Sequence, residues 1–193
     1  MESAIFGLAG VIIGGLLSIA KDWWIQKQNK IKAAEYLSIQ VAYALEQYAF
    51  HCSDVVNDDG LCYGQPDKDG WYRPQVTRPN FDPKSFDVEW KALPIEFMYD
   101  ILNFPYKAKL AEDHVANIFK YSDPPDFSYE FEERQWQYAS LGIAASELAD
   151  KLRKHIGLSP RIVGDWDPVS DMKCHKTYID SQRAKRLPKN TAD

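Results

Sequence analysis

Cysteine is scarce in this sequence, which has only three among its 193 residues. Cys52, Cys62 and Cys174 are too few and too widely spaced for a disulfide framework, and an odd number leaves at least one thiol unpaired. A reducing compartment is therefore expected. Positive charge is also in short supply, because 23 Lys and Arg face 28 Asp and Glu. We expect no nucleic-acid partner, since proteins that bind nucleic acids usually carry a basic surface.

Motifs of known enzyme classes are missing as well. The sequence has no glycine-rich nucleotide loop, no Gly-x-Ser-x-Gly and no His-Glu-x-x-His. Possible zinc ligands occur only as the adjacent pairs His51-Cys52 and Cys174-His175, and neighbouring side chains on a helix point about 100 degrees apart. Cys52 is more simply explained as a small core residue. No cofactor and no metal are expected.

Long apolar runs are absent except for one at the N-terminus. Residues 3–20, SAIFGLAGVIIGGLLSIA, are eighteen residues without a charge. As a helix this segment is roughly 27 Å long, close to the roughly 30 Å of a bilayer core. Lys21, Trp23 and Trp24 follow, and indole rings favour the membrane interface. This pattern predicts a transmembrane anchor over residues 1–25, with those three residues at the membrane surface.

The orientation of the anchor follows from the basic residues beside it. Lys21, Lys27, Lys30 and Lys32 follow the segment and none precedes it, which predicts a single-pass protein of the inner (cytoplasmic) membrane with its C-terminal domain in the cytoplasm. A cleaved signal peptide is one alternative, although a basic n-region is lacking. A buried core helix is another, although such helices are rarely apolar on every face. An interfacial helix would need a polar face.

Small residues line one face of the apolar segment. Gly7, Gly10, Gly14 and Ser18 recur at steps of three and four, and such a seam lets helix backbones approach closely in lipid. It predicts self-association or packing against the membrane helix of a partner; the alternative is that glycine is simply common in membrane helices. A glycine-rich apolar N-terminus before a charged helix resembles many small bacterial membrane proteins. The likeness covers only this part of the chain and carries no functional residues.

The remaining sequence predicts a cytoplasmic helical bundle over residues 26–187, followed by a flexible tail over residues 188–193. Its first helix is expected from Lys30 to about Val56, because apolar residues recur at helical spacing. These residues are Ala34, Leu37, Val41, Ala44 or Leu45, Tyr48, Cys52 and Val55. No proline or glycine interrupts residues 16–59, so the membrane helix is expected to continue into this one, with Gly60 as a left-handed cap.

Three further helical regions follow a long loop over residues 60–92, which is rich in proline and aromatics and is expected to pack over the helices. Pro94 opens the first of these regions, and Pro105 is expected to break or kink it. Ser128 and Gly157 mark the ends of the next. Asp167-Pro168 opens a last helix to about Arg186, whose thin apolar face predicts a surface position. The predicted fold is mainly α.

Two functions from different classes are compatible with these patterns. The first is a membrane-anchored interaction module, with the lipid bilayer and either a second copy or a membrane protein as partners. The alternative is a membrane-tethered enzyme with an uncatalogued site in the loop over residues 61–91, near His51, His114 or Asp165. The C-terminal basic residues are candidate contacts for anionic lipid, or else a solvated helix face. They are Arg183, Lys185, Arg186 and Lys189.

Overall fold

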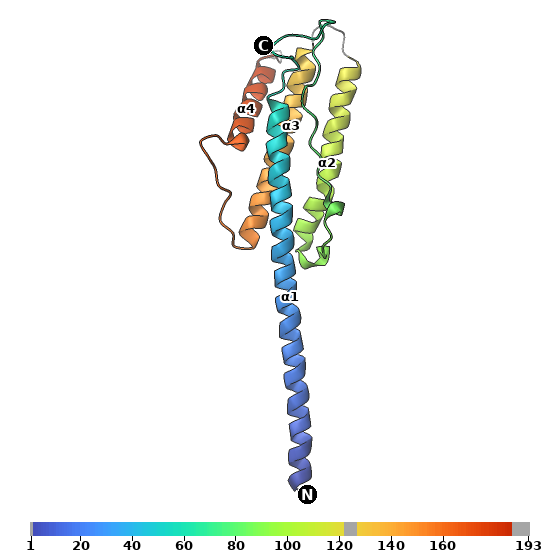
Figure 1. Ribbon diagram of the computed structural model, residues 1–193, viewed down its shortest axis with the longest axis vertical. Coiled ribbons are helices and arrows are strands. Elements are labelled where there is room, and N and C mark those ends of the chain that lie inside the picture. The colour runs from blue at the N-terminus through green and yellow to red at the C-terminus, as the bar shows by residue number, and fades with distance from the viewer. Residues whose placement is uncertain (1, 122–126, 187–193) are drawn as a thin grey trace, which may run out of the picture.

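The computed structural model describes residues 2–121 and 127–186, with side chains from Gly14 onwards. Its described part is mainly helical, as predicted, with 73% of residues in helix. The α-helices are α1 (Glu2–Val56), α2 (Ile95–Lys120), α3 (Ser128–His155) and α4 (Pro168–Arg186), and the 3-10 helices are η1 (Pro83–Ser85) and η2 (Trp90–Ala92). Figure 1 shows the bundle of α2, α3 and α4 around the C-terminal half of α1, whose N-terminal half projects alone.

α1 is one unbroken helix of 55 residues, which confirms that the apolar segment continues into the first helix of the bundle. The stripe predicted for its C-terminal half forms the centre of the core, because Leu37, Val41, Leu45 and Cys52 are all buried. From Gly14 to Lys32, by contrast, every side chain is exposed. The helix is therefore divided into a packed half and a stalk, which we define as residues 14–32.

α3 packs along α1, and a glycine allows the two helices to approach each other closely. A Cβ atom added at Gly142 would lie 2.8 Å from the Cβ of Cys52 on α1 and 2.6 Å from the sulfur of Met172 on α4. No side chain larger than hydrogen fits this position without displacing its neighbours. Gly142 thus marks the point where α1, α3 and α4 converge.

α2 does not break at Pro105, so that part of the prediction is wrong, while a kink at this position stays a prediction. The helix continues from Ile95 to Lys120 with Pro105 inside it. Proline removes one backbone hydrogen bond from a helix. Ile101 and Phe104 precede the proline and are buried in the core, where Phe104 packs edge-on against Tyr48 at a centroid distance of 5.2 Å. Burial of these side chains offsets the lost hydrogen bond.

Three helix ends follow the predicted capping residues, whereas Ser128 is the first residue of α3 and Phe127 holds the N-cap position without a side-chain hydrogen bond. Gly60 has a φ of 78°, just after α1 ends, and an added Cβ there would overlap the ring of Phe131. Gly157 has a φ of 72° after α3. Asp167 caps α4 by accepting hydrogen bonds from the Val169 amide at 3.1 Å and the Ser170 hydroxyl at 2.6 Å.

The loop over residues 60–92 packs over the helices as predicted, since Phe81 is buried and Val76, Phe86 and Trp90 are partly buried against the core. α4 is less superficial than expected. The three residues of its predicted apolar face, Val169, Met172 and Ile179, are all buried, because the helix packs against both α3 and α1.

The predicted transmembrane segment lies mostly outside the described side chains, because these begin at Gly14. Among the described residues, no helix contains a stretch that is both long and apolar enough to span a bilayer.

Candidate functional site

The residues predicted at the membrane surface lie on the exposed stalk of α1. Trp23 and Trp24 are 65% and 61% exposed, and the Lys27 ammonium lies 5.4 Å from the ring centroid of Trp23. Lys21 is exposed as well. No described part of the chain covers these side chains, so their apolar surface has no partner within the described structure.

The predicted glycine seam is described only in part. Gly7 and Gly10 lie outside the residues whose side chains are described. At Gly14 an added Cβ would meet no atom within 4 Å, and Ser18 is exposed. The described end of the seam is thus open to solvent or to another molecule.

The same face of α1 continues as an apolar stripe along the bundle. Tyr36 follows Ser18, and Tyr43 follows Ile25, by five full turns of a helix with 3.6 residues per turn. Ile25, Tyr36 and Tyr43 are all exposed. Figure 1 shows that α1 keeps one direction from the stalk into the bundle, so these positions lie on one side of the helix. We call this set, with Ser18, the α1 face.

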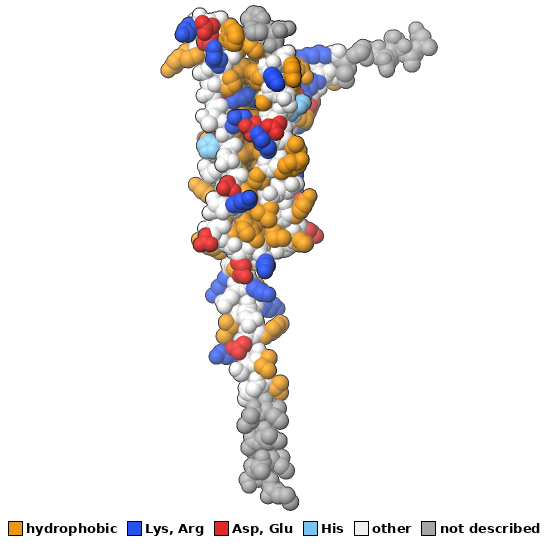
Figure 2. All heavy atoms as spheres, turned by 90° about the vertical axis from the view of Figure 1, so that its right-hand side faces the viewer, with side chains coloured by type: hydrophobic (Ala, Val, Ile, Leu, Met, Phe, Trp, Pro, Cys, Tyr) orange, Lys and Arg blue, Asp and Glu red, His pale blue; other side chains and the backbone are white. Residues whose placement is uncertain are grey.

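α2 carries a second exposed apolar stripe. Its large side chains recur at steps of three and four along the side of the helix that faces away from the core. They are Ile95, Tyr99, Leu102, Tyr106 and Leu110. Figure 2, which views the molecule from this side, shows hydrophobic side chains gathered over the part of the bundle nearest the stalk.

The candidate lipid contacts at the C-terminus are largely engaged within the bundle. Arg183 pairs with Glu132 at 3.2 Å and with Glu133 at 2.6 Å, and Arg186 pairs with Glu132 at 2.8 Å. These ion pairs fix α4 to α3. Lys185 is exposed, and Lys189 lies outside the described residues. Contact of this segment with lipid stays a prediction.

The histidines of the enzyme hypothesis are held by separate partners. His51 lies 3.4 Å from Asp54 on its own helix, whereas His114 on α2 lies 3.1 Å from the buried Glu133 on α3. Asp165 is exposed in the connection before α4. These three residues do not share one site, so the structure does not bring the proposed catalytic groups together.

The two adjacent cysteine and histidine pairs differ in burial and in their contacts. Cys52 is buried, as predicted for a core residue, and burial raises the pKa of its thiol. Cys174 is exposed, and His175 lies 3.1 Å from the Gln135 side chain. Over residues 2–121 and 127–186, no three His, Cys, Asp or Glu side chains cluster as metal ligands would.

A buried ion pair between Asp58 and Arg134 organises the loop, and the sequence offered no signal for it. The Asp58 side chain is 1% exposed and that of Arg134 is 3% exposed, and their atoms Oδ2 and Nη1 lie 2.9 Å apart. Asp58 also accepts hydrogen bonds from the backbone amides of Gly60, Gln75 and Val76 at 2.9 to 3.0 Å. These bonds tie the loop to the end of α1.

The charge of Asp58 is retained in this buried position. Burial alone would raise the pKa of its carboxyl, but the amides of Val76, Gly60 and Gln75 and the guanidinium of Arg134 outweigh burial and lower it. Arg134 donates a further hydrogen bond to the carbonyl of Val76 at 3.0 Å. Each member of the pair thus has a further hydrogen-bond partner, as a buried charge requires.

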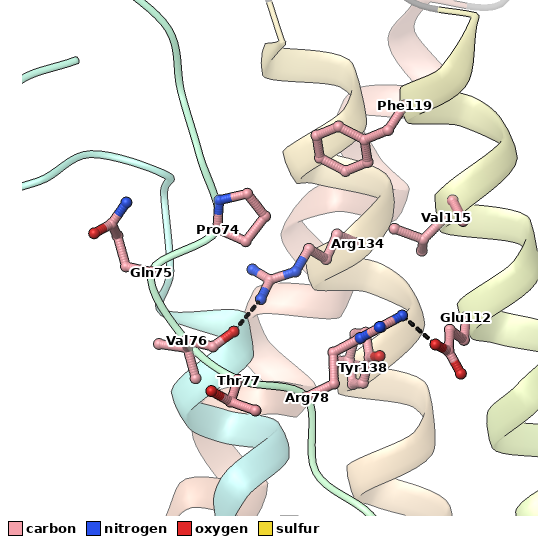
Figure 3. Close-up of a pocket in the computed structure, with 11 residues that line it drawn as sticks. Pro74, Gln75, Val76, Thr77, Arg78, Glu112, Val115, Phe119, Arg134 and Tyr138 are labelled. Atoms are coloured by element: carbon pink, nitrogen blue, oxygen red, sulfur yellow. Dashed lines mark hydrogen bonds and ion pairs between the residues drawn. The ribbon is translucent and has the colours of Figure 1, made fainter. Parts of the chain in front are cut away.

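Beside this ion pair lies a pocket of about 410 Å³ between the loop, α2 and α3 (Figure 3). Arg78 reaches across its mouth from the loop and pairs with Glu112 on α2. One wall is apolar and consists of Val115, Ala116 and Phe119 of α2. We call this cavity the Arg78 pocket.

Tyr138 of α3 borders the Arg78 pocket and also a neighbouring cavity of about 320 Å³. Arg78 and Glu112 line both cavities, so their ion pair divides one from the other. The Tyr138 side chain is only 3% exposed, but its hydroxyl is not among the fully buried atoms that lack a partner in the described residues. Burial raises the pKa of this phenol to about 12, so at neutral pH the hydroxyl keeps its proton as a donor.

Comparison with models of protein families, with curated proteins and with solved structures finds no match to this chain. Its function is therefore argued from the surfaces and cavities of the molecule itself.

Proposed function

We propose that this chain is a helical interaction module tethered to the cytoplasmic face of a membrane by residues 3–20 and self-associating through the α1 face. Eighteen uncharged residues favour hydrocarbon over water, and Trp23 and Trp24 follow them on the exposed stalk. Because α1 is a single helix, a tether at its N-terminus holds the bundle at a fixed distance from the membrane.

The observation that carries this proposal is the unpartnered surface of α1. A lone helix in water does not usually expose large apolar residues, and the stalk exposes Leu16, Leu17, Ile19, Trp23 and Trp24. In lipid, small residues such as Gly14 and Ser18 allow two helices to pack closely. Above the membrane, Ile25, Tyr36 and Tyr43 continue on the same side and supply apolar contacts for the same partner helix.

The occupant proposed for the α1 face is a second copy in parallel orientation, because two copies anchored in one membrane present this face at the same height. A symmetric pair brings each α1 face against its counterpart. The exposed stripe on α2 then remains available to a further cytoplasmic partner.

Cysteine crosslinking in membranes tests the self-association. In a chain with the exposed Cys62 and Cys174 replaced by serine, Ile25→Cys places a thiol on the α1 face, and Lys27→Cys places one on the opposite side of the same stalk. We expect mild oxidation to give a covalent dimer for Ile25→Cys and little for Lys27→Cys. Equal crosslinking of the two variants, or none with Ile25→Cys, contradicts the proposal.

A further inference from the structure

The Arg78 pocket has the composition of a binding site rather than of a packing defect. Cavities that bind small molecules are mostly apolar and carry a few polar groups that fix the orientation of the ligand. Here Val115, Ala116 and Phe119 form the apolar wall, while Arg78 and Tyr138 supply donors. Its volume of about 410 Å³ lies within the range of such sites.

The hydroxyl of Tyr138 is a second polar group that a ligand in the pocket could reach. The side chain is largely buried and borders the open volume of the pocket, and its hydroxyl is not among the fully buried atoms that lack a partner in the described residues. A tyrosine hydroxyl in this position can donate a hydrogen bond to water or to an acceptor atom of a ligand.

Arg78 defines the charge of that acceptor. Its guanidinium has five N–H donors, and within the described structure only its contact with Glu112 is formed. Arg134, on the far side, is already neutralised by Asp58. An anionic group would therefore bind Arg78 rather than Arg134. The carboxylate that pairs with Arg78, that of Glu112, is partly exposed, whereas the carboxylate that pairs with Arg134 is buried.

Glu112 has a second partner to which it can turn. Its carboxylate lies 3.6 Å from the ammonium of Lys109, one turn earlier on α2. A ligand carboxylate can thus take the place of Glu112 at Arg78 while Glu112 keeps an ion pair. The exchange costs little, because exposed ion pairs contribute only a small part of the stability.

We propose that the Arg78 pocket binds a small carboxylate with an apolar body, which is held by Arg78 and the Tyr138 hydroxyl and covered by the apolar wall of α2. The carboxylate accepts hydrogen bonds from both donors, and the body contacts Val115, Ala116 and Phe119. This site is independent of the α1 face and of membrane attachment.

Isothermal titration of the full chain with 1-naphthylacetate tests the proposal, with the neutral 1-naphthylacetamide as the matched probe. We expect saturable binding of the acid at least roughly tenfold tighter than that of the amide, because a charged hydrogen bond to arginine is lost in the amide. Absence of saturable binding up to millimolar acid, or equal binding of acid and amide, overturns the proposal.

Substitutions test whether the ligand binds in the Arg78 pocket and distinguish a change in affinity from a loss of the fold. Tyr138→Phe keeps the ring and removes the donor, and we expect it to weaken binding of the acid roughly three- to tenfold, as does Arg78→Gln. Glu112→Gln removes the competing carboxylate and is expected to tighten binding, a gain that a damaged fold does not produce. Arg73→Gln removes an arginine of the same loop that does not line the pocket and should leave the affinity unchanged. Unchanged affinity in all three pocket variants contradicts the assignment.

Discussion

Asp58 shows how one side chain can determine the path of a long loop. In the sequence it stands beside Asp59 and Gly60 and is readily interpreted as part of a helix end, which it is. Its principal partner, Arg134, is 76 positions away, and no local pattern indicates that pairing. The amides of Gln75 and Val76 complete the site, so the loop is fixed by contacts that arise only when the helices have assembled.

Asp58→Asn is expected to lower the free energy of unfolding by about 3–5 kcal/mol, because Arg134 is then left buried without a counter-charge. Asp59→Asn is the matched control: Asp59 is exposed, and among the described residues its side chain accepts a hydrogen bond only from the Leu61 amide. The free energy of unfolding of this variant should therefore fall by less than about 1 kcal/mol. Urea denaturation measures both changes. Similar losses in the two variants would disprove the special role of the buried pair.

Gly142→Ala is expected to destabilise the bundle by about 1–3 kcal/mol, although alanine is the better helix former. The added methyl group would press on Cys52 of α1 and Met172 of α4. Gly164→Ala provides the control, since an added Cβ there meets no atom within 4 Å. Thermal unfolding compares the two, and a Gly142→Ala variant as stable as the parent chain would show that the helices are packed less closely than described.

Asp167 is expected to make the fold less stable as the pH falls. Burial alone would raise the pKa of this carboxyl, but hydrogen bonds from Ser170, Arg161 and the Val169 amide lower it from the ordinary 3.8 to about 2. A carboxyl with a lowered pKa stabilises the fold above its ordinary pKa, and this contribution disappears as the pH falls from about 4 towards about 2.

The unfolding free energy should therefore fall between about pH 4 and about pH 2, and less steeply in Asp167→Asn, which has no proton to take up there. Equilibrium denaturation at several pH values measures this slope. Identical slopes for the parent chain and the variant would contradict the role of Asp167.

At the scale of elements, helical periodicity and capping residues accounted for most of the architecture. The stripe from Leu37 to Val55 becomes the core because one side of α1 meets the other helices. Gly60 and Gly157 end their helices because only glycine takes a left-handed conformation without strain. A break at Pro105 was predicted wrongly, since local propensity alone does not register the burial of Ile101 and Phe104 in the continuous α2.

The site residues also divide into those that a local sequence pattern indicates and those that only the assembled fold brings together. Trp23 and Trp24 were predicted to lie at a membrane surface from their position beside an apolar segment, which is a local pattern, and this stays a prediction. The Arg78 pocket was not predicted, because Arg78, Glu112 and Tyr138 come from three separate segments. Arg183 was interpreted as a candidate lipid contact on the basis of local charge, whereas its acidic partners lie some 50 positions earlier in α3.

Deletion of residues 3–20 is expected to leave the bundle folded, since every side chain described from Gly14 to Ala20 is exposed. The melting temperature of the deletion variant should match that of the full chain, both measured by circular dichroism in the same detergent buffer. A large drop in melting temperature would mean that the N-terminal segment contributes to the fold of the bundle.

The whole molecule is a compact bundle carried on a long helix, and this asymmetry is the basis of the proposed function (Figure 1). The bundle has a complete core of its own, so the projecting stalk is not explained by folding. Its exposed apolar side chains have no partner within the described structure, and the uncharged run of residues 3–20 is the reason for proposing lipid as one.

Flotation of carbonate-washed membranes through a sucrose gradient tests the tether most directly, with the deletion of residues 3–20 as the control. Carbonate removes peripheral proteins and leaves inserted helices in lipid, and no electrostatic contact of the C-terminal arginines should survive it. We predict that the full chain floats with the lipid and that the deletion variant stays in the load fraction. A full chain that remains in the load fraction beside its deletion variant would contradict membrane anchoring.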